Sequence, residues 1–207
     1  MSQFMKPFSE ACERNKVPIL DVITPLLKSC SELLEIGSGS GQHAVYFAEK
    51  LPHLIWQTSD RSDNHWAINL WIDEANSKNI KRPFELDVTQ NHWPESKFDA
   101  VFTANTAHIM PWEAVVAMIK GVGNLLGKNG LFIIYGPFNY QGQFTSESNA
   151  RFEMWLKEQA QHQGIRDFEA FEEQANEVGL ELVNDIEMPA NNRVLVFSKL
   201  CDGSKKP

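Results

Sequence analysis

Short apolar runs alternate with amphipathic segments along most of this chain. Seven runs have the length and composition of strands: residues 33–36, 54–60, 82–88, 98–105, 131–136, 180–187 and 193–199. Six further segments repeat their apolar residues at helical spacing: residues 18–28, 42–50, 65–76, 112–126, 148–161 and 167–178. Strands that alternate with helices in this way predict an α/β fold with a doubly wound sheet, and the last two strands predict a terminal antiparallel hairpin.

The first helix is expected to begin near Pro18, because proline suits the first turn of a helix. Pro25 should kink or split this helix. The polar cluster at residues 13–16 then precedes the helix as a solvated lead-in, the usual role of charges outside a periodic segment.

The helix at residues 65–76 is expected to be capped by Asp63 or Asn64. Its spacing places Trp66, Leu70 and Trp71 on the inward face.

Residues 137–149 are too polar and too rich in glycine for a regular element, yet they contain three aromatic side chains. Long loops of this composition are often lids or binding loops. The helix that follows Asp167 is expected to use this residue as its N-cap and to end before Gly179.

Three glycines at alternate positions, Gly37, Gly39 and Gly41, end the strand at 33–36, and a helix begins directly after them. Glycine lets the backbone approach a ligand closely and adopt the positive φ angles of a sharp turn. The helix directs its unpaired N–H groups at whatever lies over the glycines. We therefore interpret residues 37–41, with Ser38 among them, as a nucleotide-type binding loop.

Asp60 ends the second strand, 19 positions after Gly41. An acid at about this distance is what a ribose diol requires as an acceptor. Glu35, two positions before the first glycine, would place a negative charge where a pyrophosphate should lie. The loop is therefore a poor site for an anion and a good one for an α-amino group or a sulfonium.

The pattern from Glu35 to Gly41 resembles motif I of class I S-adenosylmethionine-dependent methyltransferases, and Asp60 resembles their ribose-binding acid. The resemblance implies a Rossmann-like sheet of seven strands in the order 3-2-1-4-5-7-6, with the last strand antiparallel. It also implies that Asp87 accepts a hydrogen bond from the adenine amino group. An aspartate at the end of a strand can equally start a turn.

His108 lies in the loop that follows the fourth strand. Ligands of open α/β sheets gather at the carboxyl ends of the strands, so this loop should border the reacting centre. We take His108 as the first candidate for catalysis, although a buried histidine often has a packing role. Asn105 before it and Tyr135 on the fifth strand are expected to line the same region, Asn105 as a cofactor contact and Tyr135 as a second catalytic candidate.

Several further segments resemble one group, the methyltransferase family labelled domain of unknown function 938, called methyltransferase-like 26 in animals. The matching segments are residues 13–16, 18–20, 34–44, 104–109, 135–138, 145–146, 148–149, 164–167 and 188–192. The resemblance implies that the N-terminal segment caps the cofactor, with Arg14 binding the cofactor carboxylate or an acidic substrate, and with Asn15 beside it. His43 could contact the methionine end of the cofactor or pack against its neighbours.

Composition narrows the function further. The chain of 207 residues carries a net charge of −8, which disfavours a nucleic-acid substrate. Its three cysteines are far apart and match neither a disulfide framework nor a zinc site. The sequence has no signal-peptide core and no membrane-length apolar run, so we expect a cytoplasmic protein with no membrane partner. We expect one domain with a cap at 1–30, a core at 31–200 and a disordered tail at 201–207.

The expected function is methyl transfer from S-adenosylmethionine to a small molecule. The fourth strand is not followed by the Asn/Asp-Pro-Pro-Tyr/Phe motif, so exocyclic base amines are disfavoured acceptors. One alternative is a catalytically idle scaffold that binds the cofactor or a partner. An NAD-dependent oxidoreductase is the other, but the glycine spacing for a pyrophosphate is missing. The oligomeric state does not follow from the sequence.

Overall fold

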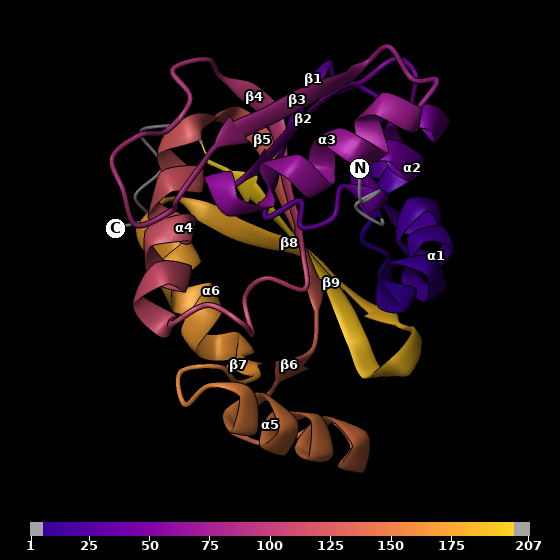
Figure 1. Cartoon of the computed structure of the whole chain (residues 1–207). Coiled ribbons are helices and arrows are strands. Elements are labelled where there is room, and N and C mark those ends of the chain that lie inside the picture. Colours follow the sequence, from indigo (N-terminus) through magenta and orange to yellow (C-terminus); the bar gives the residue numbers. More distant parts are fainter. Residues whose placement is uncertain (1–5, 201–207) are drawn as a thin grey trace. The chain divides into compact units, whose positions relative to one another are not determined.

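The computed structural model describes residues 6–200, so the expected tail at 201–207 lies outside the described residues. Figure 1 shows the elements in chain order. The chain divides into two compact units, residues 1–87 and 88–207, and each is described below by itself. The expectation of a single domain stays a prediction.

The first unit contains three parallel strands and three α-helices. Its elements are α1 (Glu10–Leu26), β1 (Glu32–Ile36), α2 (Gln42–Lys50), β2 (Ile55–Asp60), η1 (Ser62–Asn64), α3 (His65–Glu74) and β3 (Ile80–Glu85). β2 pairs in parallel with both β1 and β3. Because every connection crosses over through a helix or a loop, the carboxyl ends of all three strands lie at one edge.

Helix α1 begins eight residues earlier than expected, at Glu10 rather than at Pro18. The Ser9 side chain accepts a hydrogen bond from the Cys12 N–H and caps the helix, and Glu10 and Glu13 in the first turn favour its positive end. The polar cluster at 13–16 is therefore helical, not a lead-in. Pro18 and Pro25 both lie inside this helix, which continues to Leu26, so Pro25 does not split it.

Helix α3 has a different inward face from the one expected. Ala67 and Ile68 are its buried residues, whereas Trp66 is 50% exposed. Leu70 and Trp71 are half-buried, and the Trp71 Nε1 donates to the Pro7 carbonyl oxygen at 2.8 Å. The small Ala67 and the branched Ile68 bring this helix close to the residues 37–41, which a tryptophan on the same face would prevent.

The second unit contains four long strands, two short ones and three α-helices among its described residues. Its elements are β4 (Phe98–Ala104), α4 (Trp112–Leu125), β5 (Leu126–Gly136), β6 (Phe138–Asn139), α5 (Glu147–Gln159), β7 (Arg166–Asp167), α6 (Phe168–Glu177), β8 (Leu180–Met188), η2 (Pro189–Asn191) and β9 (Asn192–Lys199). β5 pairs in parallel with β4 and antiparallel with β9, and β9 pairs antiparallel with β8.

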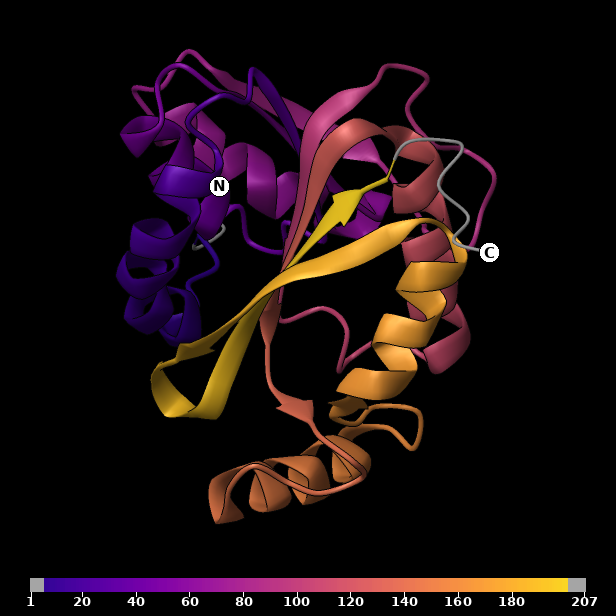
Figure 2. The same ribbon diagram turned by 180° about the vertical axis from the view of Figure 1, so that it is seen from behind.

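Helices α4 and α6 lie side by side in both views, and α6 also packs against β8 (Figures 1 and 2). Three stacked or tilted rings from three elements fill the space between them and the strands: Phe132, Phe171 and Phe197. Helix α5 lies away from this pair, beside the short β6 and β7 strands. The segment at 137–149 was expected to contain no regular element, but it includes β6 and the start of α5.

The seven long strands form one mixed sheet in the order β3-β2-β1-β4-β5-β9-β8. This is the order predicted from the resemblance, because the short β6 and β7 strands pair with each other in a separate sheet and only shift the numbering. The antiparallel β9 lies between β5 and β8, as expected. The fold is Rossmann-like.

Candidate functional site

The loop of residues 37–41, the glycine loop, turns sharply because all three of its glycines have positive φ angles, 71°, 58° and 86°. The Gly41 N–H donates to the Ser38 carbonyl oxygen at 2.8 Å and closes the turn. A Cβ on Gly41 would lie 3.0 Å from the Ile68 Cα, whereas a Cβ on Gly39 would meet nothing within 4 Å. Gly41 is thus required for packing, and the space beside Gly39 is open.

Glu35, at the end of β1, is 2% exposed. Its Oε2 accepts hydrogen bonds from the Ser38 hydroxyl at 2.8 Å and from the Trp56 Nε1 at 3.1 Å. Burial raises the pKa of Glu35 to about 7, and the nearby Asp60 charge adds to this effect against the two hydrogen bonds. This carboxyl group is held at the base of the glycine loop, where a ligand cation would stabilise its ionised form.

Asp60 ends β2 and contacts the other side of the glycine loop. Its Oδ2 accepts from the Gly39 N–H at 2.8 Å, and its Oδ1 accepts from the Asn64 side chain at 2.8 Å. The structure therefore brings the predicted ribose acid to the predicted loop. The Leu86 N–H donates to the Asp60 carbonyl oxygen at 2.9 Å, which places the half-buried Asp87 one residue from this contact.

Gln42 is a site residue that the sequence reasoning missed. Its side chain is 3% exposed and holds the start of α1 through the backbone of Ser9: Oε1 accepts from the N–H at 2.9 Å and Nε2 donates to the carbonyl oxygen at 3.2 Å. Nε2 also donates to Glu13 at 3.2 Å. A glutamine directly after a glycine loop was the available signal. Through it, α1 is tied to the first turn of α2.

His43 and Asn15 are brought together, with His43 Nε2 2.6 Å from the Asn15 Oδ1. Burial lowers the pKa of His43 to about 4 against a hydrogen bond to the Cys12 backbone, and its ring stacks on Phe47 with centroids 5.2 Å apart. Both residues therefore join α1 to α2. Arg14 points elsewhere: its side chain is 72% exposed and pairs with Glu10 at 3.3 Å.

In the second unit, the residues 105–111 form the histidine loop that follows β4. Asn105 has a positive φ of 60°, and its N–H donates to the Tyr135 carbonyl oxygen at 2.9 Å. The loop thus begins at the carboxyl end of β5, where the Tyr135 side chain is 3% exposed. A hydrogen bond of 2.6 Å between the Thr103 and Thr106 hydroxyls continues the turn.

His108 is 7% exposed within the histidine loop. Burial lowers the pKa of His108 to about 4, and the charge of Arg166 adds to this effect. The His108 ring meets the Phe152 ring edge to face at 5.3 Å, and its Nδ1 lies 3.8 Å from the position of a Cβ built on Gly136. The imidazole is therefore neutral near pH 7, able to accept a hydrogen bond at one ring nitrogen and donate at the other.

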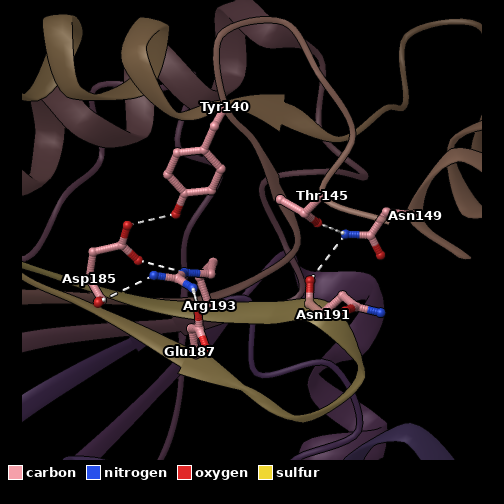
Figure 3. A network of polar contacts seen from close by, with 7 residues as sticks. All are labelled: Tyr140, Thr145, Asn149, Asp185, Glu187, Asn191 and Arg193. Carbon is pink, nitrogen blue, oxygen red and sulfur yellow. Dashed lines mark hydrogen bonds and ion pairs between the residues drawn. The ribbon is translucent and has the colours of Figure 1, made fainter. Parts of the chain in front are cut away.

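The segment at 137–149 is fastened to the β8–β9 hairpin at two places, as Figure 3 shows. At the first, the Tyr140 hydroxyl donates to Asp185 Oδ2 at 2.7 Å, and the Arg193 Nε donates to Asp185 Oδ1 at 2.7 Å. At the second, the Asn149 Nδ2 donates to the Thr145 hydroxyl at 2.9 Å and to the Asn191 carbonyl oxygen at 3.1 Å. The segment is thus an ordered wall rather than a free loop.

Among the described residues, no group of three or more histidine, cysteine or carboxylate side chains is arranged to hold a metal ion. Within residues 6–200, no helix has both the length and the apolar composition needed to cross a membrane.

A family model described as "Protein of unknown function (DUF938)" matches residues 6–199. The chain belongs to this family. The match spans both units and contains every candidate site residue described above.

Solved structures of methyltransferases resemble the DUF938 chain in fold. An O-methyltransferase family protein from Burkholderia thailandensis matches at a TM-score of 0.81 with 15% identity, over 92% of this chain and 58% of that one. Human N-acetylserotonin methyltransferase, in complex with SAM, matches at 0.78 with 14% identity, over 93% of this chain and 53% of that one. PigF with SAH matches at 0.76 with 13% identity, over 90% and 56%. The chain therefore spans between half and three fifths of these proteins.

Proposed function

We propose that this DUF938 protein is an S-adenosylmethionine-dependent methyltransferase. The observation that carries the proposal is the pair of acids on the glycine loop, Glu35 bound through Ser38 and Asp60 bound to the Gly39 N–H. A pyrophosphate would be repelled by the two carboxylates there. A ligand that carries a cation and a ribose would be favoured, because Glu35 would stabilise the cation and Asp60 would accept from the ribose hydroxyls. The SAM and SAH complexes of proteins with this fold support the same cofactor.

The residues present fit this cofactor. The space beside Gly39 is open. Asp60 Oδ1 already accepts from the Arg61 N–H and the Asn64 side chain, but Oδ2, which accepts from the Gly39 N–H, keeps a lone pair for a ribose hydroxyl. Asp87 is the candidate acceptor for the adenine amino group. When bound, the cofactor supplies an electrophilic methyl group on a sulfonium. The contribution of the chain is alignment and exclusion of water, which can supply several kcal/mol.

Helix α1 is the proposed cover of the cofactor. Gln42 and the pair of Asn15 and His43 fix its first two turns to α2. The exposed Arg14 projects from the same helix and pairs only weakly with Glu10, since both side chains are largely in solvent. It can therefore exchange this partner for a ligand carboxylate, the role that the resemblance implies.

The proposed acceptor is a small molecule that meets the histidine loop. His108 would accept the proton of an O–H or N–H acceptor, since its imidazole is neutral near pH 7. Tyr135 and the ordered wall at 137–149 shape the pocket, and Asn105 is a candidate cofactor contact. Nucleic acid is a disfavoured acceptor because the chain carries a net charge of −8.

The test is thermal and chemical unfolding with S-adenosylmethionine, S-adenosylhomocysteine or NAD. A ligand at 100 times its dissociation constant stabilises the native state by about 2.7 kcal/mol. We expect stabilisation by the first two and none by NAD. Asp60→Asn should abolish it, whereas Asp63→Asn, an exposed acid nearby, should not. Stabilisation by NAD alone would contradict the proposal.

Turnover is tested with labelled S-adenosylmethionine and fractionated metabolite extracts. His108→Ala should lower transfer by about 10²-fold or more while the cofactor affinity stays the same, because general-base catalysis contributes this much. Cofactor binding with no transfer to any fraction would instead favour the catalytically idle scaffold.

A further inference from the structure

The four residues at 164–167 make polar contacts with three other segments of the second unit: the histidine loop, α5 and the segment at 137–149. The Gly164 N–H donates to the His108 carbonyl oxygen at 2.8 Å, and the Ile165 N–H donates to Glu153 on α5 at 2.5 Å. Asp167 Oδ2 accepts from the Gly142 N–H at 2.8 Å. Between them, Arg166 turns back to the histidine loop. The segment is therefore a junction of three others.

The Arg166 guanidinium donates to carbonyl oxygens on both sides of His108. Its Nε lies 2.8 Å from the Ala107 oxygen, and one terminal nitrogen bonds the Met110 oxygen. The same nitrogen lies 3.1 Å from the His162 oxygen. The His108 carbonyl oxygen accepts from the Gly164 N–H, so residues 164–167 bind the carbonyl groups of three of the four residues from 107 to 110.

The chemistry of these contacts favours a positioning role over a stabilising ion pair. In the described residues, the guanidinium bonds neutral carbonyl groups, while the nearest carboxylates, Glu153 and Glu113, act on it only through their charge. Burial lowers the pKa of Arg166, so enclosing this cation costs free energy. In return, the planar guanidinium group holds two carbonyl groups in a fixed relative orientation.

We propose that Arg166 is a positioning residue for His108, setting the conformation of the histidine loop through the carbonyl groups of Ala107 and Met110. These contacts fix the turn at residues 106–110, in which the Met110 N–H donates to the Thr106 carbonyl oxygen at 3.2 Å. It holds the His108 ring against Gly136 and Phe152. This role rests on the proposed function only in that His108 borders the acceptor.

A second effect of Arg166 distinguishes this role from simple packing. Its positive charge disfavours a second positive charge on His108 and so lowers the pKa of the imidazole, in addition to burial. The other groups near this pair are the apolar Phe152 and the acids Glu153 and Glu113, which act on Arg166. Removal of the arginine charge therefore shifts the His108 titration upward.

The experiment uses the full chain with Arg166→Met, Arg166→Lys and the matched control Arg151→Met, which removes a 67% exposed arginine from α5. NMR titration gives the pKa of His108, assigned by the signal lost in His108→Gln. Hydrogen exchange gives the protection of the backbone amides of residues 106–110. Cofactor-induced stabilisation, measured in parallel, tests the proposed function separately, because it needs no contribution from Arg166.

We expect Arg166→Met to raise the pKa of His108 and to accelerate exchange in the histidine loop by about tenfold or more, the effect of losing charge-assisted hydrogen bonds. Arg166→Lys should accelerate exchange while leaving the pKa near that of the wild type, since it keeps the charge and loses the fork. Arg151→Met should change neither. Loop protection equal to the wild type in both Arg166 variants would overturn the proposal. If Arg166→Met fails to fold, the lysine variant decides by exchange alone.

Discussion

The glycine loop and the histidine loop both follow a parallel strand and both lead to a buried imidazole, yet they are held in different ways. Ser38 and Gly39 bond Glu35, the penultimate residue of β1, and Asp60, the last residue of β2. The histidine loop has local bonds as well, but Ala107 and Met110 are held by Arg166, 59 and 56 positions away in the chain. One loop is fixed by its neighbours and the other by a remote side chain.

This difference decides what a substitution does. Contacts within one βαβ unit form together, so a change in the glycine loop should affect folding and binding at once. A remote anchor can be removed while the strand and helix beside the loop remain, so a change at Arg166 should affect the loop alone. Three further predictions test the comparison, from the largest expected effect to the smallest.

The largest effect is acid lability caused by two buried imidazoles, His43 on α2 directly after the glycine loop and His108 in the histidine loop. The pKa values of His43 and His108 are both lowered to about 4. Their stabilising contribution is full above pH 6.5 and is lost as the pH falls through 4, up to about 3 kcal/mol for each histidine. Chemical denaturation at pH 7.5 and 4.5 should show a smaller pH dependence for His43→Gln and for His108→Gln.

His92→Gln, at an exposed position, is the control for this measurement. Glu35 contributes with the opposite sign, because its raised pKa of about 7 makes the folded state gain stability as the pH falls from 7 to 4.5. A wild-type protein that is equally stable at both pH values, with no change in the histidine variants, would show that neither ring is buried as described.

The next effect separates two glycines of one loop. Gly41→Ala should lower the free energy of unfolding by about 2–3 kcal/mol. Alanine would be strained at the left-handed φ of residue 41, and its Cβ would lie 3.0 Å from the Ile68 Cα. Gly39→Ala has open space around it, so it should cost only about 1–2 kcal/mol from its φ angle. Its main effect should be weaker cofactor binding. Urea denaturation and ligand-induced stabilisation distinguish the two, and equal losses of stability would contradict the assignment.

The smallest effect concerns the wall at 137–149. Asn149→Ala removes the two hydrogen bonds of its Nδ2 and should cost about 1–2 kcal/mol, since the Asn191 carbonyl oxygen loses a buried donor. Asn184→Ala, at an exposed position on β8, should cost less than about 0.5 kcal/mol. Cofactor-induced stabilisation should be unchanged in both variants. A loss of cofactor binding in Asn149→Ala would show that the wall contributes to the glycine loop after all.

Sequence periodicity predicts the strands of the sheet, and the spacing of residues 33–60 predicts the glycine loop, because strand, turn, helix and terminal acid all lie within this range. The order of the strands is predicted by the family resemblance. The predicted start of α1 at Pro18 is wrong, because Ser9 caps the helix and Glu10 and Glu13 favour its first turn, so that Pro18 lies inside it. Trp66 was placed on the wrong face, since its neighbours Ala67 and Ile68 supply the close packing instead.

The contacts that could not be predicted are those between distant segments. Nothing near Arg166 in the sequence points to Ala107 or Met110, because the pairing depends on how β7 is placed by the chain between them. Gln42 follows the glycine loop directly, but its partners on α1 belong to a helix that was expected to begin later. Side-chain contacts of this kind follow from tertiary packing and leave no periodic pattern.

The position of β9 in the sheet has a consequence for how the protein is made. β9 lies between β5 and β8, but the ribosome produces it after both. Until residues 192–199 emerge, β5 and β8 each present an unpaired edge, and unpaired edges are where nascent chains aggregate. A ribosome that stalls within β8 therefore leaves a chain with a nearly full complement of helices and an open sheet, the species most in need of a chaperone.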